Sequence, residues 1–475
     1  MLILRRLLFL FGILPPISGY AIFHSDGIRE IITDVSPYHV NNIRDNYPYL
    51  YDVVTQNSPH SNAYQDICVK DLLCVSGLAN FDLLYTDREG EPFAPAQASL
   101  LGVGIRPLHG VNSNNIFGSI NNIDLLLDIG VKNWVYGHFD FAYVNANRRV
   151  KTFAHKQADW GSVYRSSAAL KVNQAYLLFA RPDLYPVYLQ VGRINSPFGH
   201  YTPFSMTPTL PQLLSQSRTG GIVVGIAMEN GFYGSLYWTI SQESSENLNG
   251  FEQGGMVFGN NGDRNYGAKL GYHNCLSNEL EVHFNAAYVA DMRDSDYLLE
   301  GAFLYNIAVR REFTAAQYIL RNSWVKMQRA EGVSLHGDFD YAGFGLSFDC
   351  VAALQNLSQN PDLDSKIYAY DLTGHARFQV FGFDTQFRAS YQAAENTRVH
   401  FPFIRVVDDL GPPPYFLAEV GNVFPKYRYQ LDYEFVLTRS ISIAAQWVLD
   451  HDWDEAHDGT GKKSTIAMLR LHAEF

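Results

Sequence analysis

Hydrophobic and polar residues alternate one by one along the last segment of the chain, KSTIAMLRLHAEF. Its apolar positions would share one face of an extended strand: Ala467, Leu469, Leu471, Ala473 and Phe475. Its polar positions would share the other face: Arg470, His472 and Glu474. A period of two is typical of a β-strand with one apolar and one polar face.

The same alternation recurs upstream and predicts about 16 strands, within a range of roughly 14–18, because strand boundaries drift by a few residues in such an analysis. The predicted strands cover residues 75–85, 118–130, 133–145, 170–181, 186–194, 220–230, 231–242, 263–274, 278–291, 324–335, 338–352, 367–380, 382–394, 426–437, 439–450 and 463–475. Tight turns such as Phe381-Gly382 and Lys132-Asn133 alternate with long loops. The pattern is weakest between residues 291 and 338, where residues 302–322 could instead form a helix within a loop.

Two kinds of all-β fold could use such strands. In a soluble sandwich the apolar faces pack between two sheets, whereas in a membrane barrel they face lipid and the polar faces line the lumen. The chain has 30 Tyr and 31 Phe, and many of them end the apolar faces, as interfacial girdles require. The long connections also all fall on one side. The sequence therefore predicts an all-β, transmembrane, antiparallel up-and-down β-barrel in contact with the lipid of the bacterial outer membrane.

The N-terminus has the features of an export signal. Two arginines precede an apolar run over residues 7–14, and small residues follow as far as Ala21. A membrane-spanning helix needs about twenty apolar residues, and Pro15 ends this run too early. We therefore expect a signal peptide over residues 1–21, a short periplasmic segment over residues 22–74 and the barrel over residues 75–475.

Cys68 and Cys74 lie just before the first predicted strand, in the segment CVKDLLC. In an oxidising periplasm they could close a small loop as a disulfide, or they could be two unpaired buried thiols. Their spacing is not the CxxC pattern of a zinc site, so we expect no metal ligation by cysteine.

The number of strands bears on function. Small barrels are filled by their own side chains, whereas a barrel of about sixteen strands leaves an aqueous channel unless something fills it. A transporter driven by TonB has about twenty-two strands and a globular plug, and residues 22–74 are too short for such a plug. We therefore expect a passive or facilitated channel.

A proline-rich stretch, INSPFGHYTPFSMTPTLPQLLSQSRTGG, follows the strand that ends in VYLQVGR. Its prolines exclude a regular strand or a long helix, and its aromatic residues make a fully solvated loop unfavourable. The stretch could fold into the channel mouth and narrow the pore, or pack on the outer rim. Arg193, His200 and Arg218 flank it or lie within it and could meet an anionic ligand.

The polar faces of the C-terminal strands carry both signs of charge. We expect these residues to line the lumen: Asp371, His375, Arg377, Asp384, Arg388 and Arg428. Across the predicted Phe381-Gly382 turn, Gln379 should face Asp384. Such rows could brace a wide barrel, or create the field that orients a charged solute, or do both.

The sequence contains no motif of a serine hydrolase, a P-loop NTPase, a zinc protease or a dinucleotide-binding enzyme. Four histidines fall on the lumen side by parity, and we expect them to be wall residues bonded to water and neighbours: His138, His283, His375 and His472. The net charge of −12 disfavours a nucleic-acid partner. We therefore expect no catalytic residue, no metal site and no cofactor.

Three segments resemble the LbtU-type siderophore porins of Legionella and related intracellular bacteria: VGRINSPFGHYT, SQSRTGGIVVGIAMENGFYGSLYW and RNYGAKLGY with the later AAYVADMRDSD. That family has a G-R-x-x-x-P-F-G strand end, an arginine before an apolar inward strand and an N-x-G-x-x-x-G-Y hairpin partner. The matching positions are Arg193, Pro197, Phe198, Gly199, Arg218, Asn265, Gly267, Gly271 and Tyr272. The resemblance is strongest over residues 118–300 and implies a barrel that takes up a ferric siderophore without TonB. The N-terminal segment and residues 292–340 depart from the family.

Two functions therefore remain open. The leading one is a porin or receptor for a small solute, with a ferric chelate implied by the resemblance. The alternative is a structural or adhesive surface barrel with a closed lumen, whose long loops, such as residues 395–425, bind a partner. A barrel enzyme is disfavoured, because no histidine is paired with a nucleophile. The terminal strand that stops on Phe475 resembles the assembly signal of outer-membrane barrels, which implies the barrel assembly machinery as a partner.

Overall fold

The computed structural model describes residues 50, 67–69, 73–88, 115–132, 134–144, 169–181, 184–200, 206–240, 264–277, 280–295, 298, 328–358, 364–400, 405–407, 415–417, 420–422, 424–438, 440–457, 461 and 463–474. None of the helices among these residues is long and apolar enough to cross a membrane. The expected signal peptide, the possible helix over residues 302–322 and Phe475 lie outside them.

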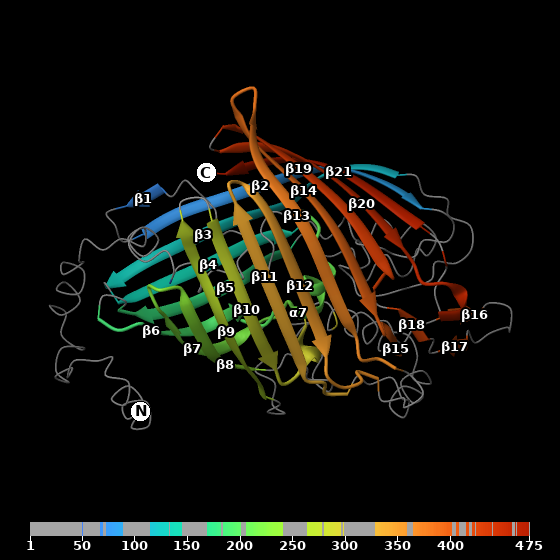
Figure 1. Ribbon diagram of the computed structural model, residues 1–475, viewed down its shortest axis with the longest axis horizontal. Helices are drawn as coiled ribbons and strands as arrows, with labels where there is room; N and C mark the ends of the chain where they lie inside the picture. The colour runs from blue at the N-terminus through green and yellow to red at the C-terminus, as the bar shows by residue number, and fades with distance from the viewer. Residues whose placement is uncertain are drawn as a thin grey trace.

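The described strands form one closed antiparallel barrel (Figure 1). In chain order they are β2 Leu73–Arg88, β3 Asn115–Lys132, β4 Val135–Val144, β5 Ala169–Ala180, β6 Val187–Asn195, β7 Arg218–Ala227, β8 Phe232–Ile240, β9 Arg264–Ser277, β10 Leu280–Val289, β11 Gly332–Tyr341, β12 Phe344–Ala353, β13 Tyr368–Val380, β14 Phe383–Glu395, β19 Tyr427–Thr438, β20 Ile441–His451 and β21 Lys463–Glu474. Each pairs with the next, and β21 pairs with β2. Closure leaves no free sheet edge, and the prediction of about 16 strands is confirmed.

A short strand, β1 Ile67–Val69, adds to the start of β2. The backbone register sets Cys68 opposite Cys74. The side chains of these cysteines are not among those described, so the disulfide stays a prediction. The barrel itself begins at Leu73, rather than at residue 75.

Two short two-stranded sheets lie in the connection between β14 and β19. Strand β15 Arg398–His400 pairs with β18 Val420–Asn422, and β16 Arg405–Val407 pairs with β17 Tyr415–Leu417. This connection and the other long ones leave from the same end of the barrel, here called the loop end. The tight turns lie at the opposite end, here called the turn end (Figure 1).

The two faces of the wall follow the alternation of the sequence. On β21, the exposed Leu469 and Leu471 face outward, whereas Met468, which directly precedes Leu469, is buried. Leu236 on β8 and Leu270 on β9 are each 69% exposed on the outer face. Polar side chains fill the inner face and are buried by one another. An apolar outside and a polar inside are what a barrel surrounded by lipid requires.

The structure corrects the predicted hairpin in the least regular part of the sequence. Strands were expected over residues 324–335 and 338–352, but β11 and β12 lie further along, and the turn between them is Ala342-Gly343. Both turn residues have positive φ, 52° and 84°, as a two-residue hairpin turn requires.

The expected turn at residues 336–337 fails for a packing reason. Gly337 lies within a regular part of β11, where an added Cβ would collide with the ring of Phe348 and crowd that of Phe284. Its lack of a side chain therefore serves the close approach of an aromatic ring on the next strand rather than a change of chain direction.

Three tyrosines on the inner face lie flat against glycines of the neighbouring strand. The pairs are Tyr188 with Gly225, Tyr233 with Gly271 and Tyr237 with Gly267. The glycines leave the space that the rings occupy, and the Tyr237 hydroxyl also donates to the Tyr288 carbonyl at 2.8 Å. These contacts stiffen the part of the barrel wall formed by β6 to β10.

We expect Gly267→Ala and Gly271→Ala to destabilise the barrel, each by about 1–3 kcal/mol, because the new methyl group would overlap a tyrosine ring and, at Gly267, also the Tyr288 carbonyl. The free energy of unfolding in urea, measured on protein refolded into lipid vesicles, checks this. Gly220→Ala is the matched control, since its Cβ would meet only the Ile240 Cδ1 atom at an ordinary 3.6 Å. Equal stability of all three variants would contradict the expectation.

Candidate functional site

The connection between β6 and β7, residues 196–217, is here called the inner loop, and the parts of it that the structure describes lie inside the barrel. Its described parts are residues 196–200 and 206–217. The short helix α7 Leu210–Ser215 lies inside the barrel and packs against β12, β13 and β14 (Figure 1). Of the two positions that the sequence left open, the structure has the loop in the channel rather than on the outer rim.

The local sequence explains the path of the inner loop. Gly199 has a φ of +82°, a conformation that favours glycine, and so turns the chain inward just after the end of β6. Thr209 caps α7, because its side-chain oxygen accepts from the Gln212 amide at 3.3 Å. Pro211 fits the first turn of the helix, where its missing amide hydrogen is not needed.

The inner loop is bonded to the opposite wall. The Leu210 amide donates to Oε1 of Gln392 on β14 at 2.9 Å. In the ring of strands β14 is diametrically opposite β6. The Arg428 Nη1 atom on β19 donates to the Pro208 carbonyl at 3.2 Å, and the Thr207 hydroxyl donates to Gln446 on β20. The loop therefore crosses the full width of the lumen.

The inner loop is also bonded to β9, to β11 and to the segment that follows β10. The Gly199 amide donates to the Ser334 hydroxyl on β11 at 3.2 Å, and Lys269 Nζ on β9 donates to the Gly199 carbonyl at 3.3 Å. The Ser295 hydroxyl, which follows β10, donates to the Leu213 carbonyl at 2.9 Å. These bonds hold both halves of the loop.

Apolar packing adds to this anchorage. Side chains of the loop and of the segments that follow β12 and β14 form one buried cluster that includes Ile194, Phe198, Leu210, Leu213, Leu214, Leu357, Ile367 and Phe424. A hydrophobic core at the loop end of a barrel is what makes burial of the proline-rich stretch favourable.

Two ion pairs brace the lumen wall, one fully buried and one with a partly exposed arginine. Arg428 Nε and Nη2 donate to the two carboxylate oxygens of Asp450 at 2.6 and 3.0 Å. Arg470 Nε and Nη2 donate in the same way to Asp82 at 2.7 and 3.0 Å. Such two-point contacts fix both partners. Only the Arg428 pair also has a described bond to the inner loop.

A third arginine is less completely bonded. The Nη2 atom of Arg388 on β14 lies 3.4 Å from Asp371 and 3.2 Å from the Thr373 hydroxyl. Its Nε and Nη1 atoms are buried and have no hydrogen-bond partner among the described residues. A guanidinium group has five donor hydrogens, so Arg388 retains capacity for a further acceptor such as the oxygen of an anion.

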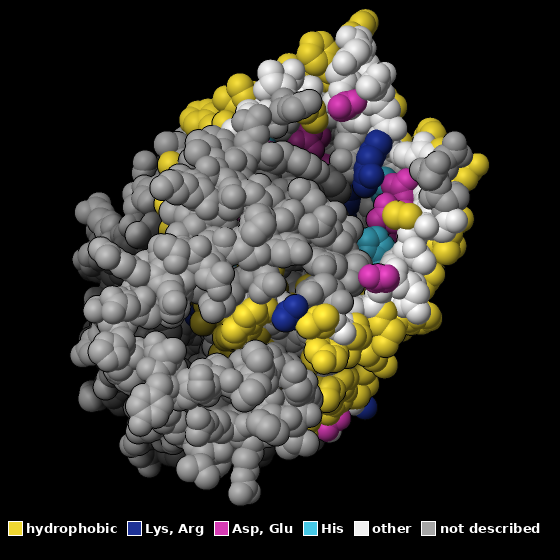
Figure 2. Space-filling model, turned by 90° about the vertical axis from the view of Figure 1, so that its left-hand side faces the viewer, with side chains coloured by type: hydrophobic (Ala, Val, Ile, Leu, Met, Phe, Trp, Pro, Cys, Tyr) yellow, Lys and Arg dark blue, Asp and Glu magenta, His cyan; other side chains and the backbone are white. Residues whose placement is uncertain are grey.

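Histidines and carboxylates cover the wall from β9 to β13. His336 bonds to Asp349 at 2.7 Å, and His375 bonds to Asp340 at 3.0 Å. Nearer the turn end, His273 bonds to Glu281 at 2.8 Å. Figure 2 shows basic, acidic and histidine side chains gathered in a recess bordered by hydrophobic side chains.

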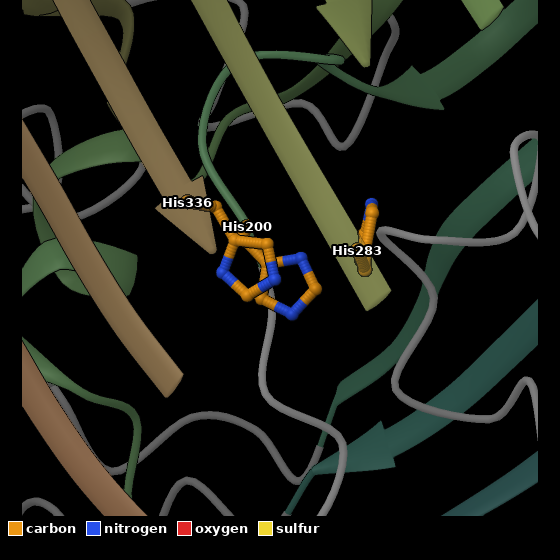
Figure 3. A group of neighbouring side chains, drawn as sticks. All are labelled: His200, His283 and His336. Carbon is orange, nitrogen blue, oxygen red and sulfur yellow. The ribbon is translucent and has the colours of Figure 1, made fainter. Parts of the chain in front are cut away.

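His200 is the residue through which the inner loop contacts this wall. Its ring stacks on that of His336, with centroids 3.6 Å apart and planes 12° apart (Figure 3). Burial, followed by the positive charge of neighbouring basic groups, holds the pKa of His200 well below its usual value. The ring is therefore neutral at pH 7, as close stacking on a second imidazole favours.

No family model matches the chain. The UPF0422 protein of Coxiella burnetii (strain RSA 493 / Nine Mile phase I) is 24% identical over 186 residues, which are 38% of this chain and 37% of that protein. The match therefore spans less than two thirds of the relative's length. Membership of the LbtU-type siderophore porins stays a prediction.

The comparison with solved structures decides the fold. OprB of Pseudomonas putida is similar with a TM-score of 0.53 and 10% identity, over 85% of this chain and 94% of that chain. The anion-selective porin from Comamonas acidovorans is similar with a TM-score of 0.46 and 9% identity, over 85% of this chain and 99% of that chain. The chain has the fold of an outer-membrane porin. Its location is the bacterial outer membrane.

Within this porin fold, five of the residues expected to line the lumen lie on its inner side or on the inner loop: His200, Asp371, His375, Arg388 and Arg428. Arg377 and Asp384 lie at the turn end, where Arg377 is half exposed and 3.7 Å from Asp340. Gln379 donates to Asp384 at 2.9 Å, which confirms the expected pairing across the turn. The role of all these residues in solute binding stays a prediction.

Arg193 and Arg218 do not join this group. On β7, Arg218 shares the outward face with the exposed Ile222, whereas Thr219 is buried on the inner face. Arg218 donates to the Asn173 side chain at 2.9 Å, and Arg193 donates to the Val172 carbonyl at 2.9 Å, both on β5. The expectation that they flank the ligand path is corrected: alternation directs them away from the lumen, and they tie β6 and β7 to β5.

The candidate site residues taken from the sequence do not include several that the structure brings to the inner loop or to its direct partners: Lys269, His336, Asp349, Gln392, Gln446 and Asp450. All lie on inner positions of their strands, so parity alone could have marked them as lining residues. Nothing in the sequence marked which of them meet the loop.

Proposed function

We propose that this barrel is a channel for uptake of a small anionic solute, with a ferric siderophore as the leading candidate. The observation that carries the proposal is the inner loop, which crosses a polar lumen and is bonded to opposite walls. A loop in this position narrows the channel but is not a separate plug domain that closes it. The side chains around the narrowed part then determine which solutes pass.

Arg388 supports an anionic solute. Two of its donor nitrogens have no described partner, and it lies on the wall that α7 contacts. The nearest carboxylate, Asp371, is 3.4 Å away and leaves most of the guanidinium group unused. An anionic oxygen that passes the loop would gain hydrogen bonds which water otherwise provides.

The resemblance to the LbtU-type family supports a ferric chelate. Its motif positions Gly267 and Gly271 seat two tyrosines, and Phe198 and Gly199 begin the inner loop. Asn265 donates to the Asp291 carbonyl at 2.7 Å and to Asp294 at 2.9 Å, so it orders the segment after β10. These motif residues build the inner loop and its support. We further propose that residues 1–21 are a signal peptide for export. The barrel assembly machinery would recognise the terminal strand that ends in Phe475.

Planar lipid bilayers test the channel. The purified mature protein should give discrete conductance steps with anion preference, because Arg388 places a positive charge on β14, a strand that α7 contacts. Arg388→Gln should lower the anion-to-cation permeability ratio, whereas Gly220→Ala should leave it unchanged. A lumen that never conducts, but opens when the outer loops are trimmed, would overturn the proposal in favour of a closed surface barrel.

Uptake by cells tests the solute. A strain that lacks the protein should accumulate a radiolabelled ferric chelate, such as ferric citrate or a ferric hydroxamate, more slowly than a complemented strain. Complementation with the Arg388→Gln variant should restore uptake only in part. Equal uptake by all strains would reject the ferric chelate and leave the channel intact.

A further inference from the structure

Three histidine side chains meet beneath the inner loop. His200 belongs to the loop, His283 to β10 and His336 to β11. One ring nitrogen from each lies within 4.8 Å of the other two (Figure 3). The three positions are far apart in the sequence, so they form no motif, and closure of the barrel with the loop inside brings them together.

His336 is oriented as a metal ligand would be. Its Nδ1 atom bonds to the Asp349 carboxylate at 2.7 Å, which fixes Nδ1 as the protonated nitrogen. The side chain is buried, and its Nε2 atom has no hydrogen-bond partner among the described residues. A histidine held by a carboxylate through one nitrogen, with the lone pair of the other directed into a cluster, is typical of metal sites.

His283 has a similar support. Its Nε2 atom lies 2.7 Å from the Tyr233 hydroxyl and 3.4 Å from the Asn285 Nδ2 atom. In the tautomer in which Nε2 donates to the Tyr233 hydroxyl, the lone pair is on Nδ1. The ring stands edge-on to His336, with centroids 4.9 Å apart. The Tyr233 ring is itself seated on Gly271, so His283 is held from behind.

His200 is the movable member. Its Nδ1 atom is buried without a partner among the described residues. In the stack with His336 the two rings are nearly parallel, so their lone pairs, which lie in the ring planes, do not converge. Rotation of the His200 ring about its side-chain bonds would direct a nitrogen toward the point that His336 Nε2 faces.

We propose that His200, His283 and His336 bind one divalent transition-metal ion of the Zn²⁺, Ni²⁺ or Cu²⁺ class, with the His200 ring turning out of its stack on binding. Three imidazoles select such ions over Mg²⁺ and Ca²⁺, which prefer oxygen ligands. The ion would join the inner loop to β10 and β11. This site is independent of the proposed solute, and a binding measurement on the isolated protein separates the two.

The charge around the cluster is mixed. The positive charges of Lys269 and Arg388 both act on His200, and Lys269 donates to the carbonyl of the adjacent Gly199. Two carboxylates offset these cations. Asp349 supports His336, and Asp338 is the direct register partner of His283 and has a buried oxygen without a described partner.

Calorimetric titration of the detergent-solubilised barrel with Zn²⁺, and visible absorption with Co²⁺, test the proposal. The protein should carry a streptavidin-binding tag, because a polyhistidine tag would bind the same ions. Wild type should bind one ion, with Co²⁺ bands typical of nitrogen ligation, and no comparable heat with Mg²⁺. His200→Ala should weaken binding at least tenfold, and Asp349→Asn should weaken it about 10–100-fold.

The matched control is His138→Ala, since His138 faces the lumen on β4 and bonds to Asp128 at 2.7 Å, away from the cluster. It should bind as wild type does. Circular dichroism and heat-dependent gel mobility verify that each variant is folded. His200→Ala removes a loop side chain that has no described hydrogen bond to the wall, so it tests the site without endangering the barrel. Unchanged affinity in His200→Ala, or no binding by wild type, would overturn the proposal.

Discussion

Replacing the inner loop by a tight turn is expected to raise the single-channel conductance at least about twofold over that of wild type. The lumen of a sixteen-stranded barrel is then open across its width. The structure permits this change. Asn195 and Arg218 are direct register partners, and the Ser196 amide donates to the Ser217 carbonyl at 2.8 Å. An Asn-Gly pair in place of residues 197–216 can therefore join β6 to β7 as an ordinary hairpin.

Single-channel recording in planar bilayers measures the effect. Heat-dependent gel mobility shows whether the shortened protein still forms a closed barrel. A folded variant with the conductance of wild type would mean that ions do not pass the inner loop, and would contradict the arrangement proposed for the pore.

Arg428→Ala is expected to destabilise the barrel by about 3–5 kcal/mol, because it leaves the Asp450 carboxylate buried without its partner. The arginine side chain is fully buried, so water cannot replace it. The same substitution removes the bond to the Pro208 carbonyl, so conductance should also rise or fluctuate. Urea unfolding in lipid vesicles and bilayer recording measure the two effects.

Arg470→Ala is the control for this pair. It breaks an ion pair of the same geometry with Asp82 but no described bond to the inner loop. We expect a loss of stability without a change in conductance. The double variant Arg428→Ala, Asp450→Ala should regain part of the stability, since no unpaired charge remains. Similar conductance in both single variants would show that Arg428 does not hold the loop.

The wall was predictable from the sequence because each strand carries its own signal. Alternation in the C-terminal segment predicted a strand over residues 463–475, and the structure has Lys463–Glu474. The prediction went wrong where a second cause overrides the pattern. At Gly337, an aromatic neighbour on β12 requires the missing side chain, and a single sequence cannot distinguish this from a turn.

The lumen was predictable only by parity. Period two placed Asp371, Arg388 and Arg428 on the inner side, but the partners of each depend on register and closure. Asp450 reaches Arg428 from the next strand, and Gln392 reaches the inner loop across 182 residues of sequence. Arg193 and Arg218 adjoin the loop in the sequence, which suggested that they could meet its ligand, whereas alternation places them on the outward face.

The inner loop is bonded to residues far away in the sequence, and this constrains the order in which the parts of the barrel can fold. The Thr207–Gln446 bond joins residues 239 positions apart, and β20 is the last strand but one. The bond can thus form only after the C-terminal hairpin has arrived, since contacts so distant in sequence form late. A nascent barrel that still lacks β20 and β21 would be unclosed, and its inner loop would lack this anchor even where its bonds to β9, β11 and β14 have formed.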